Sequence, residues 1–178
     1  MLYGRTAMLA AVMVGLAGCD RPSMRMGAPV AGGPGAHAVV HDAAGADIGH
    51  ATATTVAGGV RFTADLHGLP PGTHGIHVHT VGLCDAPGFT TAGGHWNPTG
   101  AKHGSMNPQG PHEGDLPNLI VGNDGRGTVA LVVPGATIAT LMDTDGASIV
   151  VHAGPDDLMT DPSGNSGGRI ACGVFTAG

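Results

Sequence analysis

The sequence has few aromatic residues and little positive charge. Aromatic side chains make up 3% of the 178 residues, and 7 lysines and arginines stand against 13 aspartates and glutamates. Proteins that bind nucleic acid need clustered cations on one face, which displace counterions from the phosphates. The formal net charge of −6 and the lack of a basic cluster in the sequence therefore argue against nucleic acid as a partner.

Turn-forming residues, in contrast, are abundant. The 33 glycines and 13 prolines interrupt short runs that are rich in β-branched residues. This pattern is typical of strands and loops rather than helices. The length suits one domain with a core of its own. The composition therefore predicts a single all-β domain.

Residues 1–18 have the features of an export signal. Arg5 lies in a charged start, residues 7–16 are apolar, and the run Leu-Ala-Gly-Cys ends at Cys19. This ending resembles a bacterial lipobox, which implies cleavage before Cys19 and lipidation of its side chain. We therefore expect an exported protein of the periplasm or cell envelope, anchored to a membrane by lipid. Ordinary signal cleavage without lipid is the alternative, and the choice between inner and outer membrane stays open.

Three cysteines leave one unpaired if a disulfide forms. If Cys19 carries lipid, Cys84 and Cys172 remain to pair in an oxidising compartment. The bridge would close a loop of roughly 90 residues, for which the chain-entropy model gives up to ~4.5 kcal/mol. Two separate buried thiols are the alternative.

Strand patterns follow a proline- and glycine-rich segment. Residues 19–35 are expected to form a flexible tether, and the domain is expected over 36–178. Strands are predicted at 36–41, 48–56, 60–66, 74–79, 118–121, 127–133, 147–152 and 169–175. Two long loops remain, one from 81 to 116 and one from 154 to 168. Eight short strands with two long loops predict a sandwich or a flattened barrel.

Histidines are concentrated in the run from 74 to 79 and at later positions. In a β-strand, His77 and His79 would point to the same face, because side chains alternate. The further candidate ligands are His95, His103, His112, Asp115 and His152. Six histidines and one carboxylate exceed the four ligands of a zinc ion, so the economical division is two metal ions that share one ligand.

Six motifs in this order resemble copper,zinc superoxide dismutase. They are His-Gly-Ile-His-Val-His (74–79), Gly-His-Trp-Asn-Pro (94–98), Lys-His-Gly (102–104), His-Glu-Gly-Asp-Leu (112–116), Val-Val-His (150–152) and Arg-Ile-Ala-Cys-Gly-Val (169–174). The similarity covers about residues 36 to 176. It implies an eight-stranded Greek-key barrel or sandwich, flattened, in which two long loops form a site for one copper and one zinc ion per subunit.

The resemblance also assigns roles to single residues. It implies copper ligands His77, His79, His95 and His152, and zinc ligands His95, His103, His112 and Asp115. His95 would bridge the two ions and carry a proton, and Arg169 would attract and dock the anionic substrate. Asp156 would link a copper ligand to a zinc ligand, with Asp157 as the competing assignment. His74 is expected to be structural.

The expected function is therefore dismutation of superoxide to oxygen and hydrogen peroxide, which would protect the cell envelope from superoxide made outside the cytoplasm. Storage or delivery of copper or zinc on the same scaffold is the alternative. The sequence does not decide between monomer and homodimer. Lys102 is the only lysine of the chain, so Arg169 would steer the anion nearly alone and the rate would depend weakly on salt.

Overall fold

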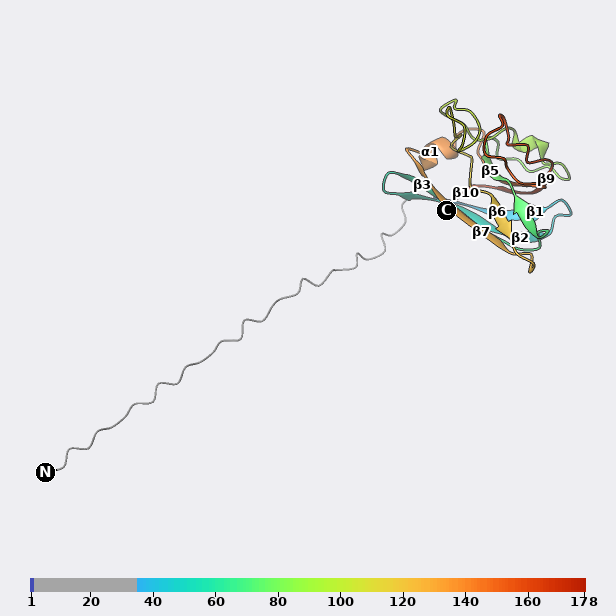
Figure 1. Ribbon diagram of the computed structural model, residues 1–178. Helices are drawn as coiled ribbons and strands as arrows, with labels where there is room; N and C mark the ends of the chain where they lie inside the picture. Colours follow the sequence, from blue (N-terminus) through green and yellow to red (C-terminus); the bar gives the residue numbers. More distant parts are fainter. Residues whose placement is uncertain (2–34) are drawn as a thin grey trace. The chain divides into compact units, whose positions relative to one another are not determined.

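The computed structural model describes Met1 and residues 35–178 (Figure 1). Residues 2–34 carry the predicted signal peptide, the predicted lipidation site Cys19 and nearly all of the predicted tether, so these predictions lie outside the described residues. The elements in chain order are β1 (Gly35–Asp42), β2 (Asp47–Val56), β3 (Gly59–Leu66), β4 (Gly72–His74), β5 (Ile76–His79), the 3₁₀ turn η1 (Thr90–Ala92), β6 (Leu119–Val121), β7 (Gly127–Pro134), α1 (Ile138–Leu141), β8 (Ser148–His152), β9 (Arg169–Val174) and β10 (Thr176–Ala177).

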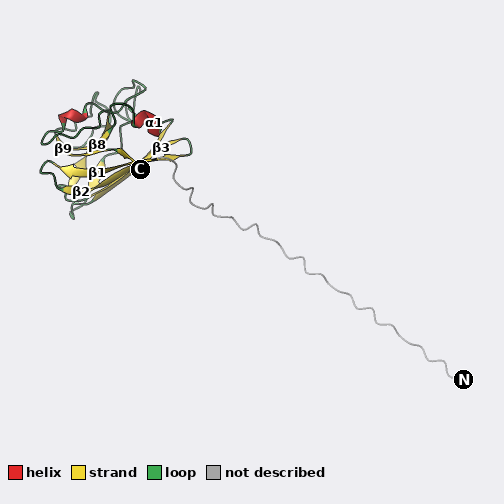
Figure 2. Cartoon of the chain, turned by 180° about the vertical axis from the view of Figure 1, so that it is seen from behind, coloured by secondary structure: helices red, strands yellow, loops and turns green. Residues whose placement is uncertain are grey.

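The strands form one large antiparallel sheet and one small pair. The large sheet has the order β5-β8-β9-β1-β2-β3-β7, with β10 paired to β1, and β4 pairs with β6. β7 lies beside β3 although β4, β5 and β6 come between them in the chain. Such a returning connection is typical of a Greek key. The all-β prediction is confirmed, and Figure 2 shows strands and loops as the main components.

Alternation of side chains sets the two faces of the first strands. In β1, Ala36, Ala38 and Val40 are buried, whereas His37 and His41 are exposed. The β pleat places every second side chain against the core. The inward residues of this strand are small or branched. The low aromatic content is therefore compatible with a full core.

Phe62 of β3 stands at the centre of that core. Its ring is fully buried and meets Trp96 and Phe175 edge-on, with centroids 6.1 and 6.2 Å apart. Edge-to-face pairs of this kind stabilise a fold by roughly 0.5–1.5 kcal/mol beyond the area they bury. Trp96 follows His95 in the chain, so the core holds the middle of the first long loop.

The predicted strand over 74–79 is divided at Gly75. β4 pairs with β6, whereas β5 pairs with β8, so the chain changes sheets between His74 and Ile76. A Cβ atom at Gly75 would lie 2.7 Å from Ser166 Oγ, so a larger residue would not fit this crossing. The single-strand prediction was wrong here because one glycine within a β-rich run does not reveal a change of sheet in the sequence. The short helix α1 and the turn η1 were also not predicted.

The two long loops gather on the same side of the large sheet (Figures 1 and 2). The first loop is tied to β9 by the Cys84–Cys172 disulfide, whose Cα atoms are 5.7 Å apart, so the predicted bridge is confirmed.

Within residues 35–178, neither helical segment has the length and apolarity needed to cross a bilayer.

Candidate metal centre

The metal-centre histidines of the sheet come from β5 and the end of β8. Antiparallel pairing places His77 opposite Val150 and His79 opposite Ser148. The rings of His77 and His79 lie 4.9 and 5.7 Å from that of His152, measured between centroids. These three imidazoles therefore stand on a rigid surface with core residues behind them.

The first long loop uses the other edge of β5. Val78 donates its N–H to Gly114 O, and Val78 O accepts from Trp96 N–H. Bridges between His79 and His95 and between His77 and Asp115 continue this pairing. The loop therefore delivers its candidate ligands to the sheet through ordinary strand-like hydrogen bonds.

All seven predicted ligand residues come together in one cluster. One ligand atom from each residue of the set His77, His79, His95 and His152 lies within 4.8 Å of the others, and the same holds for the set His77, His95, His103 and Asp115. The Nδ1 atom of His112 lies 3.2 Å from Asp115 Oδ1 and 3.4 Å from His95 Nδ1. His77 belongs to both sets by distance because its ring stacks on His95 with centroids 3.9 Å apart.

In four of the six imidazoles, the outer ring nitrogen forms a hydrogen bond to the protein. The outer nitrogen is the one that points away from the other candidate ligands, and the inner nitrogen is the one that faces them. His79 Nδ1 donates to Gly93 O at 2.9 Å, and His152 Nδ1 donates to Gly167 O at 3.2 Å. His77 Nε2 and His103 Nε2 contact the two oxygens of Asp156 at 2.7 and 3.0 Å. Such outer hydrogen bonds fix the orientation and the protonated nitrogen of a metal-binding histidine.

The inner nitrogens provide a test of whether a metal fits. Among the residues that the structure describes, five buried side-chain nitrogen or oxygen atoms lack a hydrogen-bond partner, and four of them are the inner nitrogens of one ligand set: His77 Nδ1, His79 Nε2, His95 Nε2 and His152 Nε2. A buried polar atom without a partner is unfavourable by roughly 1–3 kcal/mol. Four such atoms in one place fit a bound cation.

Burial keeps the first set in the neutral form that binds metals. It lowers the pKa of His77 to about 3 and that of His152 to about 4. The pKa of His79 also lies well below its ordinary value, and that of His95 is lowered, in both cases mainly through burial. The imidazoles are therefore uncharged near neutral pH, with lone pairs available to a metal ion.

The second set contains a strong carboxylate–imidazole network. Burial acts to lower the pKa of His103, but hydrogen bonds to Asp115 and Asp156 outweigh it and raise this pKa to about 9. Burial acts to raise the pKa of Asp115, but hydrogen bonds with His103 and His95 hold it below its ordinary value. Asp115 is therefore ionised and provides the negative charge of this half of the centre.

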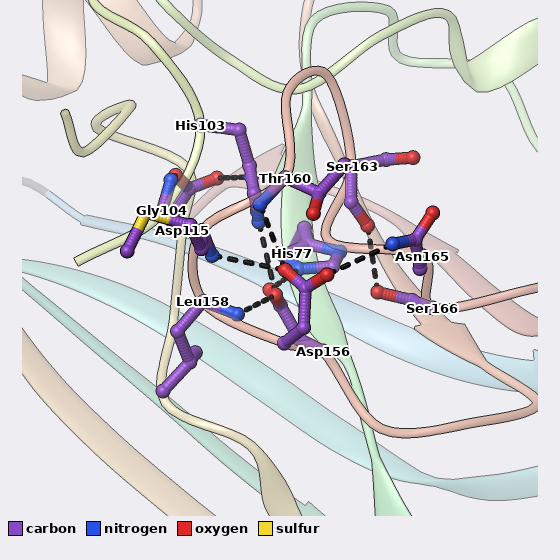
Figure 3. A network of polar contacts seen from close by, with 12 residues as sticks. His77, His103, Gly104, Asp115, Asp156, Leu158, Thr160, Ser163, Asn165 and Ser166 are labelled. Atoms are coloured by element: carbon purple, nitrogen blue, oxygen red, sulfur yellow. Dashed lines mark hydrogen bonds and ion pairs between the residues drawn. The ribbon is translucent and has the colours of Figure 1, made fainter. Parts of the chain in front are cut away.

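Asp156, rather than Asp157, lies between the two halves (Figure 3). It is buried and joins His77 to His103, and Asn118 fixes its backbone through two 2.8 Å hydrogen bonds. Asp157 is exposed, and within the described part of the chain its carboxylate accepts hydrogen bonds only from its own loop, at Met159 N, Thr160 N and Asn165 Nδ2.

Arg169 lies at the start of β9 and lines a cavity of about 400 Å³ together with His79, His95 and His152. Its Nη1 and Nη2 groups each donate a hydrogen bond of 2.6 Å, to Phe89 O and to Gly93 O respectively. Gly93 O thus accepts from both Arg169 and His79. Burial lowers the pKa of Arg169, but a guanidinium stays charged at neutral pH.

His74 is excluded from the cluster by its hydrogen bonds. Its Nδ1 lies 2.8 Å from His152 O and its Nε2 lies 2.9 Å from Pro70 O, so both ring nitrogens face carbonyl oxygens. His37, His41, His50 and His67 are exposed. The contributions of Asn118 and of the carbonyl groups of Phe89, Gly93 and Gly167 were not predicted from the sequence. The sequence does not show which backbone carbonyl oxygen makes a contact, since every residue has one.

A curled β-sheet that carries a buried cluster of six histidines and one aspartate defines a metal-binding β-barrel protein. Comparison with known proteins is more specific. The family model for copper/zinc superoxide dismutase (SODC) matches residues 48–175. Superoxide dismutase [Cu-Zn] 2 of Aquifex aeolicus is 41% identical over 146 residues, which are 79% of this chain and 85% of the relative. Superoxide dismutase [Cu-Zn] of Caulobacter vibrioides is 42% identical over 147 residues, covering 79% of this chain and 84% of the relative.

Solved structures agree with the sequence relatives. A superoxide dismutase-like protein from Bacillus subtilis has a TM-score of 0.75 at 36% identity, covering 81% of this chain and 100% of that chain. The Cu/Zn superoxide dismutase from Brucella abortus has a TM-score of 0.64 at 29% identity, covering 80% and 99%. The chain belongs to the copper/zinc superoxide dismutase family.

Proposed function

We propose that the protein converts two superoxide anions and two protons to one molecule of oxygen and one of hydrogen peroxide. Family membership supports this activity, and the four buried imidazole nitrogens without a partner are the observation that carries it. When bound, copper would supply one-electron oxidation and reduction, and zinc would help to hold the imidazole of His95. Copper is assigned to His77, His79, His95 and His152, and zinc to His95, His103, His112 and Asp115.

The donor atoms support this division. Four imidazole nitrogens suit copper(II), whereas three nitrogens and one carboxylate oxygen suit zinc. His77 is near both sets, but its Nε2 is hydrogen bonded to Asp156, which leaves only Nδ1 for a metal. His112 directs Nδ1 toward Asp115 Oδ1 and is therefore assigned to zinc. Asp156 connects the halves through His77 and His103.

Arg169 is proposed to bind the anion. Two carbonyl oxygens take one N–H each from its Nη1 and Nη2 groups, and a guanidinium has five N–H groups in all. Three N–H groups therefore remain for a small anion in the cavity that Arg169 lines. Because the carbonyl groups of Phe89 and Gly93 already hold the guanidinium, little side-chain entropy is lost when the anion binds.

His95 is proposed to move a proton. It lines the same cavity as Arg169, and its Nε2 is buried without a partner. Its Nδ1 lies 2.8 Å from Asp115 Oδ1, which keeps the ring in place. A proton held at His95 Nε2 is therefore within the site where the reduced anion needs it, as general acid catalysis requires.

We also place the protein outside the cytoplasm, anchored through lipid on Cys19. The Cys84–Cys172 disulfide supports an oxidising compartment such as the periplasm. The Leu-Ala-Gly-Cys ending of the first 19 residues supports lipidation. Mass spectrometry of the mature protein tests this point, and an N-terminus other than a lipid-modified Cys19 would refute the anchor.

The activity is tested by superoxide decay with protein that holds one copper and one zinc per chain. We expect fast decay that falls by roughly tenfold or more in Arg169→Ala, because the docking cation is lost. Arg61→Ala, on the exposed side of β3, removes the same charge and should leave the rate unchanged. Slow decay in the fully metallated wild type would instead assign the protein to metal storage or delivery.

A further inference from the structure

Asp161 connects the two long loops next to the zinc half of the centre. Its Oδ1 accepts the backbone N–H of His103 at 2.9 Å, and its Oδ2 lies 3.0 Å from Lys102 Nζ. The same Oδ1 lies 3.9 Å from His112 Nε2. One carboxylate of the loop between β8 and β9 thus reaches two residues that we assign to zinc.

The backbone at His103 is held from two directions. Its own N–H binds Asp161, and the next N–H, of Gly104, binds Asp115 Oδ2 at 2.8 Å. Gly104 also packs directly against Leu158 O, where no Cβ atom would fit. Two successive amides are therefore fixed by carboxylates, one from each loop. This arrangement fixes the backbone position from which the His103 side chain extends.

The ion pair with Lys102 does not explain Asp161. The side chains of Lys102 and Asp161 are 54% and 37% exposed, and exposed pairs contribute only about 0–1 kcal/mol. A carboxylate that accepts a backbone N–H makes a charge-assisted bond, which is about twice as strong as a neutral one. The contact that matters is therefore the hydrogen bond to His103 N–H.

We propose that Asp161 is a positioning residue for the zinc site. It acts through the His103 backbone, which sets the distance between His103 Nδ1 and Asp115 Oδ1, 3.0 Å in this structure. It touches neither substrate nor a proposed ligand atom of the copper set. The inference rests on the proposed metal assignment and adds a residue on which selective retention of zinc depends.

The test is a zinc competition with a chelator, carried out on purified protein that holds copper and zinc. Asp161→Ala should raise the zinc dissociation constant by about tenfold, the size expected for loss of an outer contact, and leave the copper dissociation constant unchanged. Asp161→Asn keeps an acceptor for His103 N–H. Its zinc dissociation constant should therefore rise only roughly threefold, since a neutral hydrogen bond is about half as strong as a charge-assisted one. Asp157→Ala is the matched control, because this carboxylate of the same loop bonds only within it.

Cobalt(II) in place of zinc gives a second readout. Its visible absorption bands report ligand geometry and should shift in Asp161→Ala but not in Asp157→Ala. Unchanged zinc binding and unchanged cobalt bands in Asp161→Ala would overturn the proposal, as would equal losses of zinc and copper or an equal loss in Asp161→Asn. A wild type that retains no zinc would refute the metal assignment itself, which separates the two failures.

Discussion

Gly164 positions the metal centre although it has no side chain. Its φ of +61° favours glycine, and a Cβ atom there would overlap Asp156 Oδ1 and lie 2.7 Å from His103 Nε2. We expect Gly164→Ala to displace Asp156, to destabilise the domain and to weaken metal binding, because His77 and His103 share this carboxylate. Urea unfolding and metal content measure both effects.

Gly100→Ala provides the control for backbone strain. Gly100 has a similar φ of +70°, but a Cβ atom there meets nothing within 4 Å. Its replacement should therefore destabilise the domain by only about 1–2 kcal/mol, from the left-handed conformation alone, and leave metal binding intact. Equal effects of the two substitutions would show that contact with Asp156 is unimportant.

For single residues, the sequence predicted what depends on side-chain type and spacing. His77 and His79 alternate with core residues, and this pattern already placed both on one face. The choice between Asp156 and Asp157 required the three-dimensional structure, because side-chain directions in a loop do not follow a regular period. Asp161 escaped prediction for a related reason, since its partner is a backbone amide.

The disulfide acts on the segment that holds Arg169. Cys84 precedes Phe89 and Gly93, whose carbonyl groups bind the guanidinium, and Cys172 lies on the same strand as Arg169. Replacing both cysteines by serine should destabilise the protein by up to ~4.5 kcal/mol in the chain-entropy model. It should also slow superoxide decay even where the variant is still folded, because Arg169 loses its fixed position.

Thermal unfolding and superoxide decay of the metallated variant measure these two effects, and the wild type treated with reductant serves as the control. A double variant with lower stability but the wild-type rate would show that Phe89 and Gly93 hold Arg169 without help from the bridge. In that case the disulfide would contribute only to stability.

At the level of elements, strands with one face buried were predictable, and the connections between sheets were not. Alternation located β1, β2 and β3 because one face of each packs on the core. The break at Gly75 depends on Ser166, which is distant in the chain. The helix α1 is only four residues long, too short for a helical period to be visible.

Charge around the cavity determines the behaviour of the whole molecule toward an anion. The formal net charge is −6, and the single lysine, Lys102, is paired with Asp161. Among the residues that line the cavity, Arg169 is the one lysine or arginine. We therefore expect long-range attraction of superoxide to be weak and capture to depend on the final contact with the proposed docking residue, Arg169.

We accordingly expect the rate constant for superoxide decay to change little, by less than about threefold, when ionic strength rises from about 0.01 to about 0.1 M. This small change is expected although the Debye length falls from about 30 to about 10 Å.

Gly168→Lys adds a cation beside Arg169 at an exposed position where a Cβ atom meets nothing within 4 Å. This variant should be faster at low salt, by up to roughly tenfold, and should show a steeper fall with added salt. Thr128→Lys, exposed on β7 and outside the cavity lining, adds the same charge and should keep the shallow dependence. A steep fall in the wild type would mean that charges beyond the cavity already steer the anion, and that Arg169 does not act nearly alone.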